Sequence, residues 1–289
     1  MVHHYEPGRP HWWQWLTVLS LDAPMVAVAW QTALARAARH PVHWHHGFIL
    51  GAAVWLAYAA DRWIEGWRLS PSMIQTQRHW FYRHWRWPVA AVWLAVLLGA
   101  VVISAIRLTS AELTAGLLLL VAVVTYLLSH QLVHRTHSWR APKEICVALL
   151  FTAGVACFIV PNEPVVLREI AGPLAFFGLL CFADCALISF WEDEVDRSHG
   201  QTSLALHFPQ GRPYVRALPW SLSVIGIIYA LQAPPQLAGI IWCAVGAGVL
   251  LGGVDILHPW LGRQLSRSLA DVGLMTPLGL LFVDCLRCA

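Results

Sequence analysis

Hydrophobic residues gather along the chain into runs of about 20 residues, and short polar stretches separate them. A helix of that length crosses the hydrocarbon core of a bilayer, which is about 30 Å thick. The runs do not alternate between apolar and polar positions as the strands of a membrane barrel do. We therefore expect nine membrane-spanning helices, at approximately 17–35, 44–62, 88–106, 113–130, 144–160, 170–191, 216–231, 237–257 and 268–286.

Composition supports this interpretation and extends it to the whole chain. Hydrophobic residues make up 58% of the sequence and charged residues only 12%, whereas a soluble domain carries about 25% charged residues. Only helices satisfy their own backbone polar groups in lipid without closing into a barrel. Residues 1–289 are thus predicted to form a single all-α polytopic membrane bundle, which excludes a soluble enzyme.

Basic residues orient the bundle in the membrane. Placing the N-terminus in the cytoplasm puts 14 of the 19 Arg and Lys residues on the cytoplasmic side of the expected topology, as the positive-inside rule requires. We expect an integral protein of a bacterial inner membrane, surrounded by membrane lipids. The net charge of +3 serves this orientation and does not indicate a nucleic-acid partner.

The sixth apolar run ends abruptly in acidic residues. Glu192, Asp193, Glu194 and Asp196 follow it directly. On a continuing helix Glu192 and Asp196 share one face, with Cβ atoms about 5–6 Å apart, so their charges repel unless a cation sits between them. Mg²⁺ binds one or two carboxylates together with phosphate oxygens. The pattern predicts a magnesium site at Glu192, Asp193 and Asp196.

A similar acidic end closes the second run. Asp61 and Glu65 are again four residues apart, and this topology places both acidic ends in the cytoplasm. Two such ends in corresponding positions suggest one shared cavity, with Asp61 and Glu65 as further metal ligands. Arginines of the adjoining segments are suited to hold phosphate oxygens in bidentate pairs: Arg68, Arg78, Arg83 and Arg197.

Two aspartates inside the expected spans are candidates for the cavity wall, because charged groups in the membrane are costly. Asp184 lies eight residues before Glu192, on the same helix face and about 12 Å deeper. Asp22 lies two residues before Pro24 in the first run. The alternative role for Asp184 is a hydrogen bond between helices, and Asp271 near the last segment fits an interfacial or packing role.

A prenyl diphosphate matches this combination of features. Its polyanionic head needs Mg²⁺ and arginines, and its hydrocarbon tail needs an apolar channel. Cleavage of an allylic diphosphate depends on stabilising the charge of the leaving group, which metal ions do as Lewis acids. The sequence therefore predicts a Mg²⁺-dependent transferase that moves a prenyl group from a polyprenyl diphosphate to an acceptor.

Short motifs make the chain similar to the UbiA-type intramembrane prenyltransferases, as a divergent member. That family has nine spans and two cytoplasmic motifs, usually N-D-x-x-D-x-x-x-D, which 57–65 and 188–196 resemble here. Residues 197–205 resemble the D-R-x-x-G-K-x-T turn, and 21–24 the L-D-x-P of the first helix. Tyr126 with the later basic and proline residues resembles the stretch after the fourth helix.

The resemblance implies roles for residues on these motifs. Catalysis falls to Asp61, Glu192 and Asp196, and the acceptor is an aromatic or other lipid precursor. The residues implied to line the cavity are Asp22, Tyr58, Tyr126, Asp184 and Ser189.

Departures from the family pattern keep two alternatives open. The leading Asn-Asp pair of each motif is missing, and Gln201 stands where the turn has a lysine. One alternative is a non-catalytic member of the fold that binds an isoprenoid lipid. The other is a metal or haem membrane protein, suggested by two histidine clusters: His43, His45 and His46, and His130, His134 and His137.

Overall fold

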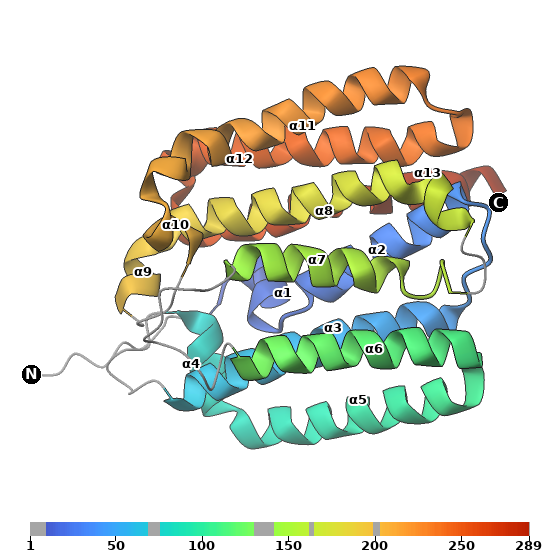
Figure 1. The fold of residues 1–289 in the computed structure, drawn as a ribbon. Helices are drawn as coiled ribbons and strands as arrows, with labels where there is room; N and C mark the ends of the chain where they lie inside the picture. Colours follow the sequence, from blue (N-terminus) through green and yellow to red (C-terminus); the bar gives the residue numbers. More distant parts are fainter. Residues whose placement is uncertain (1–9, 69–75, 130–141, 162–164, 199–202, 289) are drawn as a thin grey trace, which may run out of the picture.

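The computed structural model describes residues 10–68, 76–129, 142–161, 165–198 and 203–288, without the side chains of Arg68, Ser198 and 283–288. This part of the chain is built from helices and contains no β-strand. The helices run side by side as one bundle (Figure 1). The predicted all-α fold class is confirmed.

Each expected apolar segment overlaps one helix or two consecutive helices. Among the described residues, five helices are long and apolar enough to cross a membrane, or six if one bent pair counts as a single span. The count of nine spans therefore stays a prediction. The long helices are α2 (Asp22–Ala37), α3 (Trp44–Arg68), α5 (Arg86–Arg107), α6 (Ser110–Leu128), α7 (Lys143–Ala156), α8 (Val166–Trp191), α11 (Arg212–Gln232), α12 (Pro235–Gly273) and α13 (Pro277–Cys288).

Helices α5 and α6 lie at one edge of the bundle (Figure 1). Many of their apolar side chains are exposed. Leu98 and Val102 of α5 and Leu118 and Val121 of α6 are each more than half exposed. An apolar surface of this extent is not found on soluble monomers but is the normal lipid-facing surface of a membrane helix. The chain is accordingly an integral membrane protein.

Helix α8 occupies the centre of the bundle and packs against α7, α11 and α12. Phe177 of α8 and Trp30 of α2 are fully buried, with ring centroids 4.7 Å apart. The indole N–H of Trp30 donates to the carbonyl of Leu274 at 2.8 Å, which satisfies the polar end of an otherwise apolar ring. These contacts fix α2 and α8 beside the end of α12.

Two expected helices, the first and the ninth, are broken, and the long helix α12 is kinked between the eighth and ninth expected segments. The first bends by 79° between Trp12–Val18 and α2, where Ser20 adopts a φ of 58°. Helix α12 is kinked at Gly262, whose φ of 73° suits a residue without Cβ. The ninth segment is interrupted between Gly273 and Pro277, where α13 begins with proline at a first-turn position that needs no N–H donor.

Short helices collect at one end of the bundle, where α3 and α8 end and where α7 and α11 begin (Figure 1). They are α4 (Gln77–His84), α9 (Asp193–Ser198) and α10 (Leu204–His207). Helix α13 lies at the opposite end. The acidic ends of α3 and α8 thus share one polar face of the bundle.

Close packing of α11 on α12 gives a test of this arrangement. A Cβ on Gly248 would lie 2.4 Å from Ser223 Oγ and 2.8 Å from the backbone oxygen of Pro219. The Gly248→Ala change should therefore cost about 1–3 kcal/mol through overpacking, more than the roughly 1 kcal/mol that alanine gains in a helix. We expect a lower midpoint of thermal unfolding in detergent.

Gly253→Ala in the same helix is the matched control, because its Cβ would meet no atom within 4 Å. This variant should unfold at the wild-type temperature or above. Equal midpoints for the two variants would contradict the packing described for α11 and α12.

Candidate functional site: a network of carboxylates and cations

Two neighbouring residues of α4 connect the acidic ends of α3 and α8. Arg78 Nη2 lies 3.4 Å from Oε2 of Glu192, and His79 Nε2 lies 3.0 Å from Oε2 of Glu65. Gly66 permits this approach of α4 to α3, since a Cβ there would lie 3.1 Å from the backbone oxygen of His79. Helix α4 therefore holds both acidic ends at once.

Glu192 lies at the centre of the network. Arg267 Nη1 contacts its Oε2 at 2.6 Å, and Arg78 contacts the same oxygen. Burial opposes ionisation of Glu192, but the charges of Arg267 and Arg78 outweigh it and hold the pKa of Glu192 at about 2. Glu192 is thus a carboxylate at neutral pH and holds two arginines together.

The positive charges of Arg78 and Arg267 repel each other, and the carboxylate of Glu192, which contacts both, holds them together. Burial and then the charge of Arg267 lower the pKa of Arg78 to about 10, so its side chain stays protonated at neutral pH. Two guanidinium groups held close together by one carboxylate form a setting that favours an additional anion.

Glu65 and His79 form the second pair of the network. His79 is 2% exposed, and burial lowers its pKa, so the ring is neutral. A neutral ring can donate its Nε2–H to Glu65 and accept the Thr76 hydroxyl at Nδ1, which is 2.7 Å away. Burial disfavours the Glu65 carboxylate, yet this hydrogen bond and the positive charges of Arg78 and Lys143 lower its pKa.

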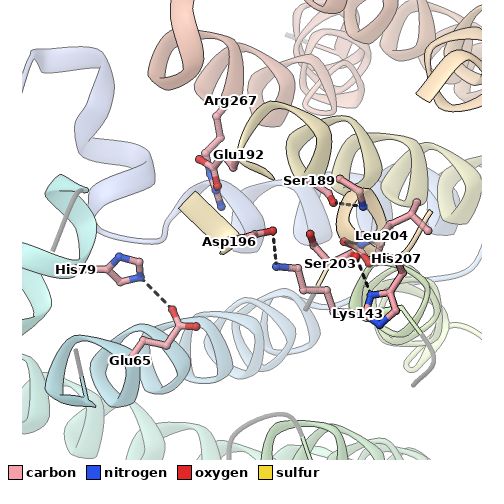
Figure 2. Close-up of polar contacts among 12 residues, drawn as sticks. Glu65, His79, Lys143, Ser189, Glu192, Asp196, Ser203, Leu204, His207 and Arg267 are labelled. Carbon is pink, nitrogen blue, oxygen red and sulfur yellow. Dashed lines mark hydrogen bonds and ion pairs between the residues drawn. The ribbon is translucent and has the colours of Figure 1, made fainter. Parts of the chain in front are cut away.

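Lys143 connects a third carboxylate, that of Asp196, to the carboxylates of Glu65 and Glu192. Its Nζ lies 3.3 Å from Oδ2 of Asp196 (Figure 2). The charge of Lys143 also acts on Glu65 and on Glu192. Carboxylates from the ends of α3 and α8 and from α9 therefore surround cations from α4, α7 and α12.

Other predicted residues lie around this network. Asp61 is half-buried, and its charge acts on Tyr126 of α6. Asp193 is half-buried, and Ser189 Oγ accepts a hydrogen bond from the backbone N–H of Ala205 at 3.1 Å. Ser189 thereby positions α10 beside α8.

Of the arginines predicted to bind phosphate, one belongs to the network and others lie outside it. Arg78 belongs to the network, whereas Arg83 donates to the carbonyl of Gly66 at 3.3 Å and holds α4 to α3. Arg197 is exposed on α9. The Arg68 side chain lies outside the described part of the structure, as do His130, His134 and His137.

Deeper polar residues lie close to one another below the network. The charges of Asp22 and Asp271 act on Tyr58, and those of Arg267 and Asp22 act on Asp184. The structure therefore brings together three of the residues expected to line a cavity, one each from α2, α3 and α8, near charged residues of α12.

The carboxylates at the centre of the network are paired with cations of the protein. Within the described residues, no three His, Cys, Asp or Glu side chains gather as a group that could hold a metal ion. Each of these carboxylates uses one oxygen in its ion pair. Arg267 contacts Oε2 of Glu192, and Lys143 contacts Oδ2 of Asp196. Mg²⁺ needs only one or two carboxylates when phosphate oxygens complete its shell.

Sequence reasoning missed Arg267, Lys143 and His79 as parts of the site. Arg267 lies four residues before Asp271 on the same helical face, which was a usable signal in the last apolar segment. Lys143 is the single lysine of the chain. Nothing in the sequence marked His79, because its role depends on the packing of α4 on α3.

Removing Arg267 tests the central ion pair. Arg267→Met should lower the free energy of unfolding by about 3 kcal/mol, because a partly buried Glu192 loses its closer cation. Arg78 still neutralises part of the charge. Adding Glu192→Gln should recover part of the loss, which chemical denaturation of the single and double variants would measure. Additive losses would show that the pair is not coupled.

Acid provides a second test. A carboxylate with a folded pKa near 2 and an unfolded value near 4.5 stabilises the fold above the unfolded value. This contribution should be lost as pH falls from about 5 to 2. Thermal midpoints should therefore drop less steeply over this range in Glu192→Gln than in wild type, and equal slopes would refute the assignment.

Comparison with known proteins identifies the fold. No protein-family model and no curated protein matches the sequence. The apo structure of a UbiA homolog from Aeropyrum pernix K1 covers 92% of this chain and 98% of its own, with a TM-score of 0.57 and 18% sequence identity. The chain therefore has the fold of that UbiA homolog, and the resemblance seen in its motifs is confirmed at the level of the fold.

Proposed function

We propose that this chain is a membrane prenyltransferase, which moves a prenyl group from a polyprenyl diphosphate to an aromatic or other lipid-precursor acceptor. The observation that supports this most is the convergence of Arg78, Arg267 and Lys143 at the polar end of a lipid-embedded bundle. The UbiA-like fold is the second support.

The cations give the diphosphate head a binding site. Guanidinium groups match phosphate oxygens in bidentate geometry, and the lysine adds a mobile point charge. Glu192 and Asp196 hold these cations in place before the substrate arrives. A preformed site of this kind loses little entropy when the anion binds.

The charge balance of the network argues for added cations. Arg78, Arg267 and Lys143 are matched by Glu65, Glu192 and Asp196, while the ring of His79 is neutral. A diphosphate therefore brings negative charge that this network does not offset. We propose that Mg²⁺ supplies the difference, held by phosphate oxygens and by carboxylates among Asp61, Glu65, Glu192, Asp193 and Asp196.

The proposed prenyl transfer is a substitution at the allylic carbon of the diphosphate. The bond between C1 of the prenyl group and the diphosphate oxygen breaks, and its electron pair leaves with the diphosphate. The arginines and Lys143 stabilise that charge as it develops. Mg²⁺, when held at the carboxylates, would supply Lewis-acid stabilisation of the same charge. The acceptor forms a new bond to C1 and loses a proton.

Diphosphate release from labelled farnesyl or geranylgeranyl diphosphate tests the proposal. Purified protein should release diphosphate with Mg²⁺ and an acceptor, and chelation should abolish the release. Glu192→Gln should slow the reaction by about 100-fold, because it loosens the arginines that meet the leaving group. Glu169→Gln is the matched control, since Glu169 is exposed at the other end of α8.

A non-catalytic lipid-binding protein of the same fold is the second candidate. The pairing of each central carboxylate with a protein group favours it, since this network is complete without a metal. It predicts that isoprenoid lipid copurifies without turnover and that Glu192→Ala leaves this binding intact. No diphosphate release across several tail lengths and acceptors would favour this candidate over the transferase.

A histidine-rich metal or haem protein has less support. His46 pairs with Glu112 at 3.2 Å, and the described residues contain no three-ligand metal group. A colourless purified protein would count against this alternative.

A further inference from the structure

An ion pair between α11 and α12 lies near the polar end of the bundle, outside the network around Glu192. Nε of Arg216 contacts Oδ2 of Asp255 at 2.6 Å. The other oxygen of this carboxylate accepts the indole N–H of Trp191 at 3.1 Å. The side chain of Asp255 is 10% exposed and that of Arg216 is 51% exposed. The carboxylate therefore anchors the pair in the bundle, while the cation is accessible from outside.

Positive charge exceeds negative charge around this pair. The charges of Asp255, Arg212 and Arg263 all act on His258. Burial and the two arginines lower the pKa of His258 despite Asp255, so its ring is neutral at neutral pH and adds no charge. Together with Arg216, three arginines thus lie near one aspartate.

Arg212 and Arg216 occupy the N-terminal end of α11, which is an unfavourable place for cations. The positive end of the helix dipole lies there, so acidic side chains stabilise this end and basic ones do not. The first turn of α11 contains no acidic residue. Arg212 is exposed, and within the described part of the chain Nε is the one side-chain nitrogen of Arg216 with a polar partner. The end of α11 thus carries positive charge that the described residues offset only in part.

The row of side chains that contains these two arginines continues along α11 as an apolar ridge. Positions four residues apart form one row on a helix surface, and the next three positions are Trp220, Val224 and Ile228. All three are exposed, the last two by more than half. Trp220 lies against α12 at Gly252, where a Cβ would lie 2.5 Å from its ring. Because α11 lies at an edge of the membrane bundle (Figure 1), this ridge is a lipid-facing surface.

A phospholipid with a net negative charge complements both parts of this surface. Its phosphate oxygens match the guanidinium groups in bidentate geometry, and its acyl chains match the apolar ridge. A soluble anion would engage the arginines and leave the ridge unused. The order along α11, first two cations and then three apolar side chains, is the order of headgroup and chains from the membrane surface inward.

We propose that Arg212 and Arg216 bind the headgroup of an anionic phospholipid, such as phosphatidylglycerol, whose acyl chains lie along the ridge of α11. Basic residues at a membrane surface attract anionic lipids. Asp255 holds Arg216 through Nε, so both Nη groups are available for the phosphate. The site is separate from the network around Glu192 and does not rest on the proposed prenyl transfer.

Native mass spectrometry of the full-length protein in detergent tests the site. The protein is titrated with an equimolar mixture of dioleoylphosphatidylglycerol and dioleoylphosphatidylcholine, and the bound lipids are counted. Wild type should retain the first lipid with about a tenfold preference over the second. Both lipids carry a phosphate and the same chains, but the choline ammonium cancels the phosphate charge and would lie beside the arginines.

Arg212→Gln removes one of the two headgroup cations and should lower this preference about fivefold, the effect of one basic residue near an anionic membrane surface. Arg212 is exposed and takes no part in the ion pair with Asp255, so the variant should unfold at the wild-type temperature in lipid-free detergent. Arg168→Gln is the matched control. It removes an exposed arginine at the other end of the bundle, where α8 begins, and should keep the full preference.

Three outcomes would overturn the lipid site. The first is equal retention of the two lipids by wild type, or a preference that Arg212→Gln leaves unchanged. The second is displacement of the lipid by an equimolar amount of glycerol 3-phosphate, which would assign the arginines to a soluble anion. The third is a lipid-free dimer that Arg212→Gln dissociates, which would assign this face to a second copy of the chain. No prenyl diphosphate is present, so each result is independent of the transferase.

Discussion

The structure depends on the cost of taking carboxylates out of water. Glu192 ends a long apolar helix and is only 9% exposed, so its charge must be met by cations from the protein. Arg267 and Arg78 meet it from α12 and α4. This requirement draws the ends of separate helices together and leaves two guanidinium groups beside each other. A site that attracts an anion follows from the same neutralisation.

The architecture places this polar network where a membrane enzyme needs it. Helices α5 and α6 present apolar side chains outward, while α8 is enclosed by α7, α11 and α12. Gly262 interrupts α12, and beyond the kink Arg267 contacts the end of α8 and Asp271 contacts α2. The charges of this network thus lie at one end and in the interior of the bundle, as expected for ionisable groups in a membrane protein.

Hydropathy was sufficient to locate the long helices but not their breaks, because the bilayer requires apolar runs of a set length and a break depends on local backbone geometry. The acidic ends at Asp61 with Glu65 and at Glu192 with Asp196 were likewise visible, since each follows an apolar run directly. The spacing of Arg267 and Asp271 marked Arg267 in the sequence, but its contact with Glu192 could not be predicted, because the helix that carries it is kinked at Gly262. His79 depends on the packing of α4 against Gly66, which no local pattern records.

A structure with a non-hydrolysable prenyl thiodiphosphate and Mg²⁺ tests the central claim most directly. Phosphate oxygens should lie about 2.7–2.9 Å from guanidinium nitrogens of Arg267 and Arg78, with the Lys143 ammonium beside them and the prenyl chain among the helices. A diphosphate bound away from these three side chains, with the pair between Arg267 and Glu192 unchanged, would contradict the account.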